Sequence, residues 1–263
     1  MSADQTCSPG QLAGKRGLVL GIANELSIAT GCARAFAASG AVLAATYLDD
    51  RAKPYVETVT NALPCEILMP CNVQDQGALE AVFAAIAQRW GRLDFVLHSM
   101  AFAPREDLHG RTIDCSAAGF ATAMDVSCHS FLRAAKLAEP LMQAGGALLA
   151  VTYIGSRQVV PHYGLMGPVK AALESAVRYA AVELGPKKIR VNAISPGPIA
   201  TRAASGIANF SALLEKEAKT SPEGELVGID DCGHMAAFLM SDAARMINGC
   251  IIPIDGGEHI IGA

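Results

Sequence analysis

The sequence has few charged residues, no basic cluster and no apolar run long enough to cross a membrane. Charged residues make up 17% of the 263 residues, and the net charge of −4 is spread without long runs of one sign. A nucleic-acid-binding protein presents a concentrated basic face, so the composition argues against a nucleic-acid partner and against a polybasic membrane surface. Because spanning a bilayer takes about 20 consecutive apolar residues, membrane insertion is not expected either.

The cysteines lack the spacing of a metal or redox site. Eight are present, with no C-x-x-C motif and no cysteine–histidine pairing of the zinc-binding kind. We therefore expect no metal site, and we expect most of these residues to be buried thiols in a reducing cytosol. The first residues contain no basic segment followed by an apolar one, so no signal peptide is predicted and a cytoplasmic location is expected.

Short apolar runs alternate with longer segments of helical period. The runs cover 16–21, 41–47, 65–70, 93–99, 146–153, 189–195 and 250–255, and the helical segments cover 27–39, 51–62, 75–89, 115–140, 163–184 and 229–241. Nearly continuous apolar runs are typical of parallel strands that are covered on both faces. The pattern predicts an α/β fold, with one Rossmann-like doubly wound domain over residues 1–263 and a seven-stranded parallel sheet. A long insertion at 196–228 is predicted to be a substrate-binding flap, since ligands bind beyond the carboxyl ends of such strands.

The first strand leads into a candidate dinucleotide site that lacks the G-x-G-x-x-G fingerprint. Gly21 closes the strand, Ser27 is placed to cap the following helix, and Gly31 and Gly40 allow close packing and a helix stop. A helix that begins there would offer free N–H groups to a pyrophosphate. A single glycine turn is weak evidence, and an ordinary strand–turn–helix connection explains it equally well.

The second strand ends in two acids, Asp49 and Asp50. Acidic residues at this point accept the ribose hydroxyls and repel a 2′-phosphate, so they favour NADH over NADPH. Arg51 and Lys53 lie close by in the sequence and weaken that inference.

Two tyrosines and a lysine form the candidate catalytic group: Tyr153, Tyr163 and Lys170. Seven helical positions turn through about 700°, so Tyr163 and Lys170 share a face if a helix begins near Tyr163. Pro168 instead places the helix start near Gly167, because proline is tolerated only in the first turn. A phenol with a pKa near ~10 is a poor acid at neutral pH unless a cation or a developing oxyanion assists it, which gives the pairing a chemical purpose.

Four motifs together resemble the enoyl-acyl-carrier-protein reductases, a divergent branch of the short-chain dehydrogenase/reductase superfamily. They are GIANELSIA from residue 21, HSMAFAP at 98–104, the tyrosines and lysine at 153, 163 and 170, and SPGPIATRAASGI at 195–207. Ordinary members of the superfamily separate tyrosine and lysine by four positions and carry N-N-A-G in place of HSMA. The resemblance covers about residues 12–258.

The resemblance implies an NADH-dependent enzyme of fatty-acid biosynthesis that reduces the trans-2-enoyl chain carried by acyl carrier protein, and a homotetramer. It implies that Tyr163 bonds the thioester carbonyl, that Tyr153 shapes the acyl site, that Lys170 holds the nicotinamide ribose and that Ala103 touches substrate. The implied cofactor contacts are Gly21, Ser27, Ile28, Leu48, Asn72, Val73, Met100, Lys170, Ile199, Ala200, Thr201, Arg202 and Ala203. Leu48 and Asn72 depart from the polar residue and the aspartate that are common in the family, and Ala101 stands where some members have glycine.

Other interpretations remain open at this point. The chain could be a short-chain dehydrogenase acting on a carbonyl or hydroxyl substrate, or a cofactor-binding regulator without catalysis. His98 is expected to be a hydrogen-bonded core histidine, and Tyr47 and Tyr179 to be packing residues. Asp125 either supports the floor of the site or joins a salt bridge, and Ser127 takes the place of a structural asparagine.

Overall fold

The computed structural model describes residues 10–201, 214, 218 and 221–261. Seven parallel strands form one sheet in the order β3-β2-β1-β4-β5-β6-β7. The strands are β1 (Arg16–Leu20), β2 (Val42–Tyr47), β3 (Cys65–Pro70), β4 (Phe95–His98), β5 (Gly146–Val151), β6 (Ile189–Pro196) and β7 (Ile251–Ile254). Each of the seven predicted runs is therefore a strand, within a few residues of its expected bounds.

Consecutive residues of one strand belong to opposite faces of the sheet. Leu18 and Leu20 lie in the hydrophobic cluster on one face, whereas Val19 lies in the cluster on the other. Successive side chains of a strand point to opposite sides, so a strand that is covered on both sides must be apolar at every position. This burial on two faces explains why the strands appear in the sequence as unbroken apolar runs.

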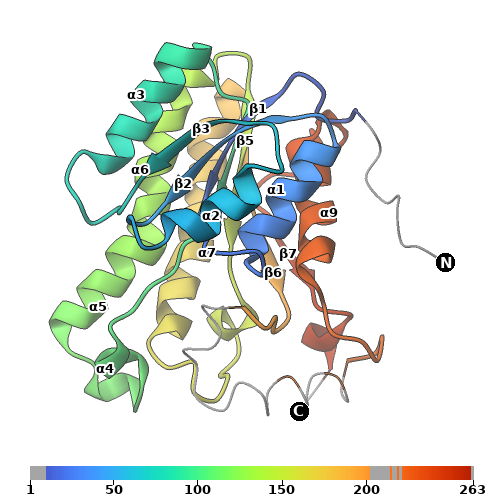
Figure 1. Cartoon of the computed structure of the whole chain (residues 1–263). Helices are drawn as coiled ribbons and strands as arrows, with labels where there is room; N and C mark the ends of the chain where they lie inside the picture. Colours follow the sequence, from blue (N-terminus) through green and yellow to red (C-terminus); the bar gives the residue numbers. More distant parts are fainter. Residues whose placement is uncertain (1–9, 202–213, 215–217, 219–220, 262–263) are drawn as a thin grey trace.

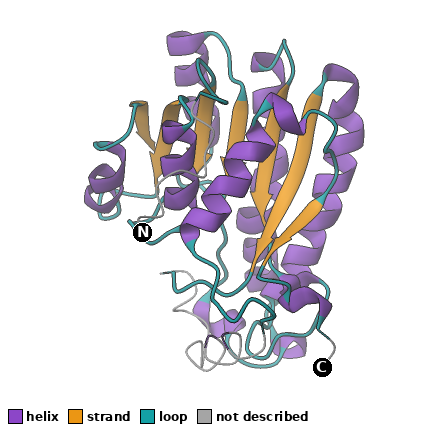
Figure 2. Ribbon diagram, turned by 90° about the vertical axis from the view of Figure 1, so that its right-hand side faces the viewer, coloured by secondary structure: helices purple, strands orange, loops and turns teal. Residues whose placement is uncertain are grey.

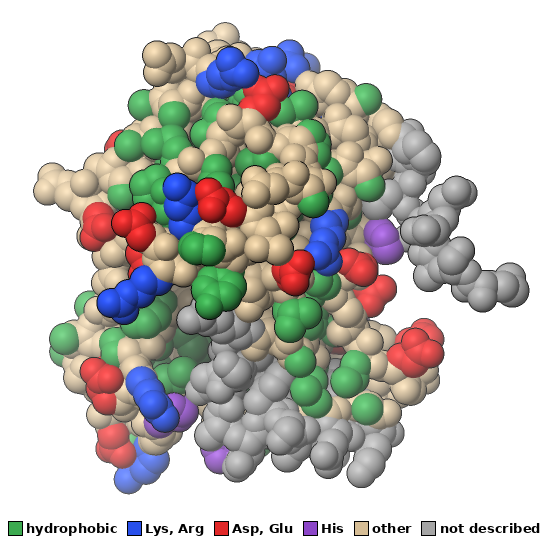
Figure 3. Space-filling view, in the orientation of Figure 1, with side chains coloured by type: hydrophobic (Ala, Val, Ile, Leu, Met, Phe, Trp, Pro, Cys, Tyr) green, Lys and Arg blue, Asp and Glu red, His purple; other side chains and the backbone are tan. Residues whose placement is uncertain are grey.

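Helices cover both faces of the sheet, as Figures 1 and 2 show. The first face packs against α3 (Ala78–Trp90), α6 (Ser130–Ala138) and α7 (Met166–Leu184), and the second against α1 (Ile28–Ala38), α2 (Lys53–Thr60) and α9 (Ile229–Met240). Two shorter helices, α4 (Arg105–Leu108) and α5 (Ala117–Met124), lie beyond the sheet in Figure 1. In the described part of the chain, no helix is both long and apolar enough to cross a bilayer. On the face seen in Figure 3, basic and acidic side chains are interspersed.

Glycines permit the close contact between α1 and α9. A Cβ added to Gly31 would come 2.1 Å from the carbonyl oxygen of Ile229, and one added to Gly233 would come 2.5 Å from the carbonyl oxygen of Gly31. Any side chain at either position would therefore separate the two helices. Gly40, with a φ of +94°, then ends the α1 region in a left-handed turn, in which the N–H of Ala41 bonds the carbonyl of Phe36.

The expected helix at 115–140 is interrupted. It comprises α5, a π-helical turn η2 (Asp125–His129) and α6. Such a turn widens the helix by one residue and often occurs at functional sites. The ordinary helical periodicity on both sides of it gives no sign of the insertion. Tyr179 also departs from its expected packing role, because it lies on the outer face of α7 and is 70% exposed.

The order of the strands reverses between β1 and β4, which are neighbours in the sheet. Chain connections leave these two strands in opposite directions, which opens a crevice where open α/β sheets bind ligands. Gly21 follows β1 directly and has a φ of +108°. A Cβ there would come 2.2 Å from the carbonyl oxygen of Ser99, so glycine is required by both its backbone conformation and the nearness of the segment after β4.

Candidate active site at the carboxyl edge of the sheet

The turn between β1 and α1 leaves the start of the helix open to a ligand. Ser27 is the N-cap residue, as expected, but its side chain makes no capping hydrogen bond. Its hydroxyl instead donates to the carbonyl of Asn24 at 2.9 Å and lies 2.9 Å from the hydroxyl of Thr30, because these groups fold back over the turn. The N–H groups of Thr30 and Gly31 bond the carbonyl of Ser27, at 2.9 and 3.3 Å. The N–H groups that precede them in the helix, from Ile28, receive no cap from the serine side chain and fit a diphosphate.

The segments after β2 and β3 lie at the expected adenine end. Asn72 starts a tight turn, with its side-chain oxygen accepting from the N–H of Gln74 at 3.2 Å and its amide bonding Asp75 at 3.1 Å. Val73 is buried in the core, and its carbonyl accepts a hydrogen bond from Arg133 at 2.8 Å. Leu48 is 58% exposed and could offer an apolar surface, but no polar group, to a bound nucleotide.

Met100 brings the segment after β4 against the glycine turn. Its Cγ lies 3.3 Å from the position that a Cβ on Gly21 would occupy. These two predicted cofactor residues are therefore neighbours, although almost 80 positions separate them in the sequence. Ile28 and Ile199 both pack against the hydrophobic cluster on the α1 face of the sheet.

Residues 199–203 are described only in part. Ala200 is exposed, and the N–H of Thr201 bonds the carbonyl of Ile199 at 2.7 Å, which forms a tight turn after β6. Arg202 and Ala203 lie outside the described residues, as does most of the predicted flap at 196–228.

Lys170 lies in the second turn of α7 with its ammonium group buried at the end of β5. The side chain is 5% exposed, and Nζ donates to the carbonyl of Val151 at 2.7 Å. Burial lowers the pKa of Lys170 to about 8, while Cys128 and Glu174 act in the opposite direction. An ammonium has three donors, so two remain for the hydroxyls of a bound ribose.

Tyr153 and Tyr163 pack edge to face, with ring centroids 4.9 Å apart and an interplanar angle of 64°. Tyr153 lies two residues after the end of β5, whereas Tyr163 lies in the turn before α7, where the N–H of Met166 bonds its carbonyl. The helix thus begins close to the position that Pro168 predicted, and Tyr163 precedes it. Burial, reinforced by Tyr153, raises the pKa of Tyr163 far above its ordinary value.

The expected assistance of Tyr163 by Lys170 therefore takes a different form. The lysine bonds the backbone of β5, and burial is the dominant influence on the phenol. A phenol with a raised pKa keeps its proton throughout the physiological range. Tyr163 is thus suited to donate a hydrogen bond rather than to act as an anionic base.

Ala103 belongs to the same apolar cluster as the two tyrosines. This cluster joins Tyr163, Leu165 and Val169 from the start of α7 with Ala123 from α5, and Ala103 and Tyr153 pack against it. Gly155 also contacts both rings, since a Cβ there would come 2.5 Å from the ring of Tyr163 and 3.3 Å from that of Tyr153. The predicted catalytic and substrate residues therefore meet, although the sequence pattern did not single out Gly155.

The π-helical turn fastens the segment that carries Met100 and Ala103. The hydroxyl of Ser127 accepts from the N–H of Phe102 at 2.9 Å and donates to its carbonyl at 3.1 Å. Asp125, for which two roles were open, forms a hydrogen bond with His129 and an ion pair with Arg133. The turn therefore supports the active-site floor through its serine.

His98 is a buried core histidine, as expected. Its Nε2 lies 2.7 Å from the hydroxyl of Ser130, which donates its own proton to the carbonyl of Val126. Burial lowers the pKa of His98 to about 3, and the nearby Lys170 contributes to this shift. The imidazole is thus neutral at physiological pH and bears its proton on Nε2. Within the described ranges, no three His, Cys, Asp or Glu residues are grouped so as to hold a metal ion.

If Lys170 holds the cofactor ribose, the affinity for NADH is expected to fall as the pH rises through about 8, because the side chain then loses its charge. The other shifted groups near the lysine do not titrate there, since the pKa of His98 is about 3 and burial raises the pKa values of Cys128 and Tyr163. Fluorescence titration of NADH binding between about pH 6.5 and pH 9.5 measures the effect. In Lys170→Met, the affinity for NADH should no longer depend on pH over this range. If the affinity of that variant still falls at alkaline pH, another group causes the fall.

Comparison with known proteins gives a consistent result. The family profile described as enoyl-(acyl carrier protein) reductase matches residues 21–259. The enoyl-[acyl-carrier-protein] reductase [NADH] 1 of Rhizobium meliloti (strain 1021) is 43% identical over 253 residues, which cover 96% of this chain and 93% of that protein. The enoyl-[acyl-carrier-protein] reductase [NADH] of Escherichia coli (strain K12) is 41% identical over 252 residues, covering 95% and 96% of the two chains.

Solved structures agree in fold over almost the whole chain. The crystal structure of the enoyl-(acyl-carrier-protein) reductase of Anaplasma phagocytophilum in complex with NAD has a TM-score of 0.93 and 42% identity, covering 97% of this chain and 98% of that one. The enoyl-acyl carrier protein reductase of Bacillus cereus, solved with NADP+ and indole naphthyridinone, has a TM-score of 0.94 and 39% identity, covering 96% and 99%. With this fold, this site and these relatives, the chain belongs to the enoyl-acyl-carrier-protein reductase family.

Proposed function

We propose that this protein reduces the double bond of trans-2-enoyl thioesters carried by acyl carrier protein, with NADH as the reductant, in fatty-acid elongation. The observation that carries the proposal is the meeting of Tyr153, Tyr163 and Ala103 in one apolar cluster. The buried ammonium of Lys170 lies on α7, the helix that follows Tyr163. An apolar wall suits an acyl chain, while a single neutral phenol provides a polar contact for its thioester.

In this proposal bound NADH would supply a hydride to the β-carbon of the enoyl group, and a proton would then reach the α-carbon to complete the saturated thioester. The hydroxyl of Tyr163 donates a hydrogen bond to the thioester oxygen, where negative charge develops as the double bond is reduced. A donor fixed in a site of low dielectric lowers the energy of such a charge more than a water molecule does. Tyr153 holds the ring of Tyr163 in place by edge-to-face packing, and its own side chain forms part of the acyl site.

The residues of the carboxyl edge fit the dinucleotide. Gly21 and the open start of α1 at Ser27 and Ile28 would hold the diphosphate, and Lys170 the nicotinamide ribose. The remaining cofactor contacts that we propose are Leu48, Asn72, Val73, Met100, Ile199, Ala200, Thr201, Arg202 and Ala203. Ala103 would touch the substrate.

We expect a preference for NADH over NADPH. The carboxylate of Asp49 accepts from the N–H of Ala52 at 2.8 Å, which fixes it at the end of β2, and Lys53 pairs with Glu57 at 3.7 Å. Two like charges about 4 Å apart in water repel by about 1 kcal/mol, so each acid should disfavour a 2′-phosphate by several-fold. Steady-state kinetics give the ratio of kcat/KM with NADH to kcat/KM with NADPH. Replacing Asp49 and Asp50 by Asn should lower this ratio about 10-fold. Equal efficiencies in the unaltered protein would contradict the assignment.

We also propose that the protein is a cytoplasmic homotetramer built from one domain per chain. All seven strands lie in one sheet, which supports a single domain over residues 1–263. The seven described cysteines are unpaired, which suits a reducing compartment. Large apolar side chains remain exposed on α5, α6 and α7, namely Phe120, Leu132, Tyr179 and Val182. Contact with further copies of the chain would cover these side chains.

Light scattering tests the oligomer. We expect about four times the chain mass of 27.3 kDa, and a smaller assembly for a variant with Tyr179→Glu and Val182→Glu, whose new charges would be buried in the interface. A particle of about 27.3 kDa from the unaltered protein would contradict the proposal.

A substrate comparison tests the activity. NADH oxidation is followed in the presence of a crotonyl thioester and of a β-ketoacyl thioester, and NAD+ reduction is followed in the presence of a hydroxysteroid. Oxidation with the crotonyl thioester alone supports the proposal. Turnover of the carbonyl or hydroxyl substrates instead would indicate an ordinary short-chain dehydrogenase, and cofactor binding without turnover would indicate a regulator.

A further inference from the structure

A buried carboxylate lies one helical turn beyond the catalytic lysine. Glu174 is four residues after Lys170 on α7 and is only 4% exposed. Its Oε1 accepts hydrogen bonds from the hydroxyls of Thr152, at 3.0 Å, and Ser156, while its Oε2 accepts from Nε of Arg157 at 3.2 Å. A buried charge is tolerated only when it is well paired, and these three donors provide that pairing.

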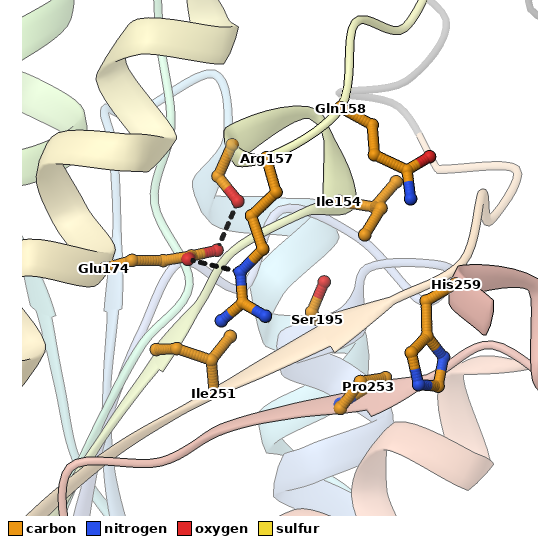
Figure 4. A pocket seen from close by; sticks show the side chains of 9 residues that line it. Ile154, Arg157, Gln158, Glu174, Ser195, Ile251, Pro253 and His259 are labelled. Carbon is orange, nitrogen blue, oxygen red and sulfur yellow. Dashed lines mark hydrogen bonds and ion pairs between the residues drawn. The ribbon is translucent and has the colours of Figure 1, made fainter.

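All three donors come from the short segment after β5, hereafter the 152–157 segment. Figure 4 shows the side chain of Glu174 reaching from α7 toward Arg157 on this segment, across a cavity that Ser195, Ile251 and His259 also line. The cavity measures about 120 Å³. A second cavity of about 390 Å³ shares part of the segment and includes Tyr163 in its lining. The 152–157 segment is therefore a wall that both cavities share.

The same segment determines where the two tyrosine rings lie. Tyr153 is part of it, between the residues that bond Glu174. Gly155 touches both rings, because a Cβ there would come 2.5 Å from Tyr163 and 3.3 Å from Tyr153. The only regular structure within it is a single 3₁₀ turn, η4 (Ile154–Ser156). The position of the 152–157 segment therefore depends strongly on the hydrogen bonds that its side chains form.

We infer that Glu174 is a positioning residue for the tyrosine pair, acting through Thr152 and Ser156. By fastening the 152–157 segment to α7, it holds both rings at a fixed place relative to Lys170 on the same helix. The inference rests on the proposed function, in which Tyr163 must meet the thioester oxygen. A displacement of about 1 Å at a catalytic group can reduce the rate about 10²-fold.

The hydrogen bonds from the hydroxyls of Thr152 and Ser156 should position the tyrosine rings more than the ion pair with Arg157 does. The side chain of Arg157 is 54% exposed, so solvent screens its interaction with the carboxylate. Thr152 is buried, as is the carboxylate that it bonds. Removal of the hydroxyls, as in Thr152→Val and Ser156→Ala, should therefore reduce turnover more than Arg157→Ala.

Steady-state kinetics of Glu174→Ala and Glu174→Gln test the inference, with Glu183→Gln on the exposed side of the same helix as control. At about pH 6.5, where Lys170 is charged, we expect Glu174→Ala to lower kcat about 10²-fold while the KM for NADH changes much less. Glu174→Gln should recover part of the loss, because its amide oxygen can still accept from the two hydroxyls. A double-mutant cycle with Ser156→Ala should be non-additive, since both changes break the same link.

A second readout does not depend on activity. Tyrosine-ring NMR resolves the chain's five tyrosines, and Glu174→Gln should shift the signals of Tyr153 and Tyr163 but not that of Tyr179, which lies outside their cluster. Unshifted signals, or a Glu174→Gln variant with full kcat and only a lower melting temperature, would show that the carboxylate serves stability alone. Failure of the unaltered protein to reduce an enoyl thioester would overturn the proposed function instead, and the NMR comparison would still decide the role of Glu174. If Glu174→Ala does not fold, the Gln and Ser156→Ala variants carry the test.

Discussion

Replacing Tyr163 by Phe is expected to lower kcat about 10²-fold with an enoyl thioester, because the variant loses the hydrogen-bond donor to the oxygen on which charge develops. The ring itself should stay in place, since its edge-to-face contact with Tyr153 and its apolar neighbours do not involve the hydroxyl. The KM for NADH should change little. Stopped-flow measurement of NADH oxidation under single-turnover conditions separates this chemical step from product release.

Two further variants make the result specific. Tyr153→Phe should have a smaller effect, because packing of its ring survives the loss of the hydroxyl. Tyr179→Phe keeps the ring on the outer face of α7, outside the cluster of Tyr153 and Tyr163, and should behave as the unaltered protein does. Full turnover in Tyr163→Phe would show that the hydrogen bond to the thioester comes from elsewhere.

Replacing Lys170 by Ala is expected to raise the KM for NADH about 10-fold to 100-fold, since hydrogen bonds from a charged group contribute about 1.5–3 kcal/mol each. The loss should precede any effect on the enoyl substrate, because the ammonium faces the end of β5 rather than the acyl cluster. The dissociation constant of NADH, measured by fluorescence in the absence of the thioester, isolates this binding term.

The choice of substitution separates charge from packing. Lys170→Met keeps most of the buried volume and should bind NADH as weakly as Lys170→Ala. Lys136→Ala removes an exposed cation from α6 and should leave binding unchanged. Normal NADH affinity in Lys170→Met would mean that the ammonium does not hold the cofactor.

Most of the fold could be predicted from the sequence because burial on two faces leaves a strong pattern. The run RGLVLG places Leu18, Val19 and Leu20 on alternate sides of a covered sheet, and no polar residue fits among them. The π-helical turn at 125–129 could not be predicted, since its residues suit an ordinary helix and the extra residue is fixed by tertiary contacts. One of these contacts is the pair of bonds between Ser127 and the backbone of Phe102.

Residues of the candidate site that share a sequence pattern could be predicted. A residue that belongs to it only because packing buries its side chain could not. Tyr153, Tyr163 and Lys170 share a fixed sequence pattern, and the structure brings the two rings together beside the helix of the lysine. Glu174 has no such pattern, because a glutamate on a helix is ordinarily solvated. Only the packing of α7 against the end of β5 buries it beside Thr152.

The direct test of the central claim is the fate of the hydride. The unaltered protein is incubated with a trans-2-enoyl thioester and NADH that carries deuterium at both positions of C4 of the nicotinamide, and the product is examined by NMR and mass spectrometry. The account predicts a saturated thioester with one deuterium on the β-carbon. Deuterium on a carbinol carbon, or an enoyl thioester recovered unchanged while NADH remains bound, would contradict it.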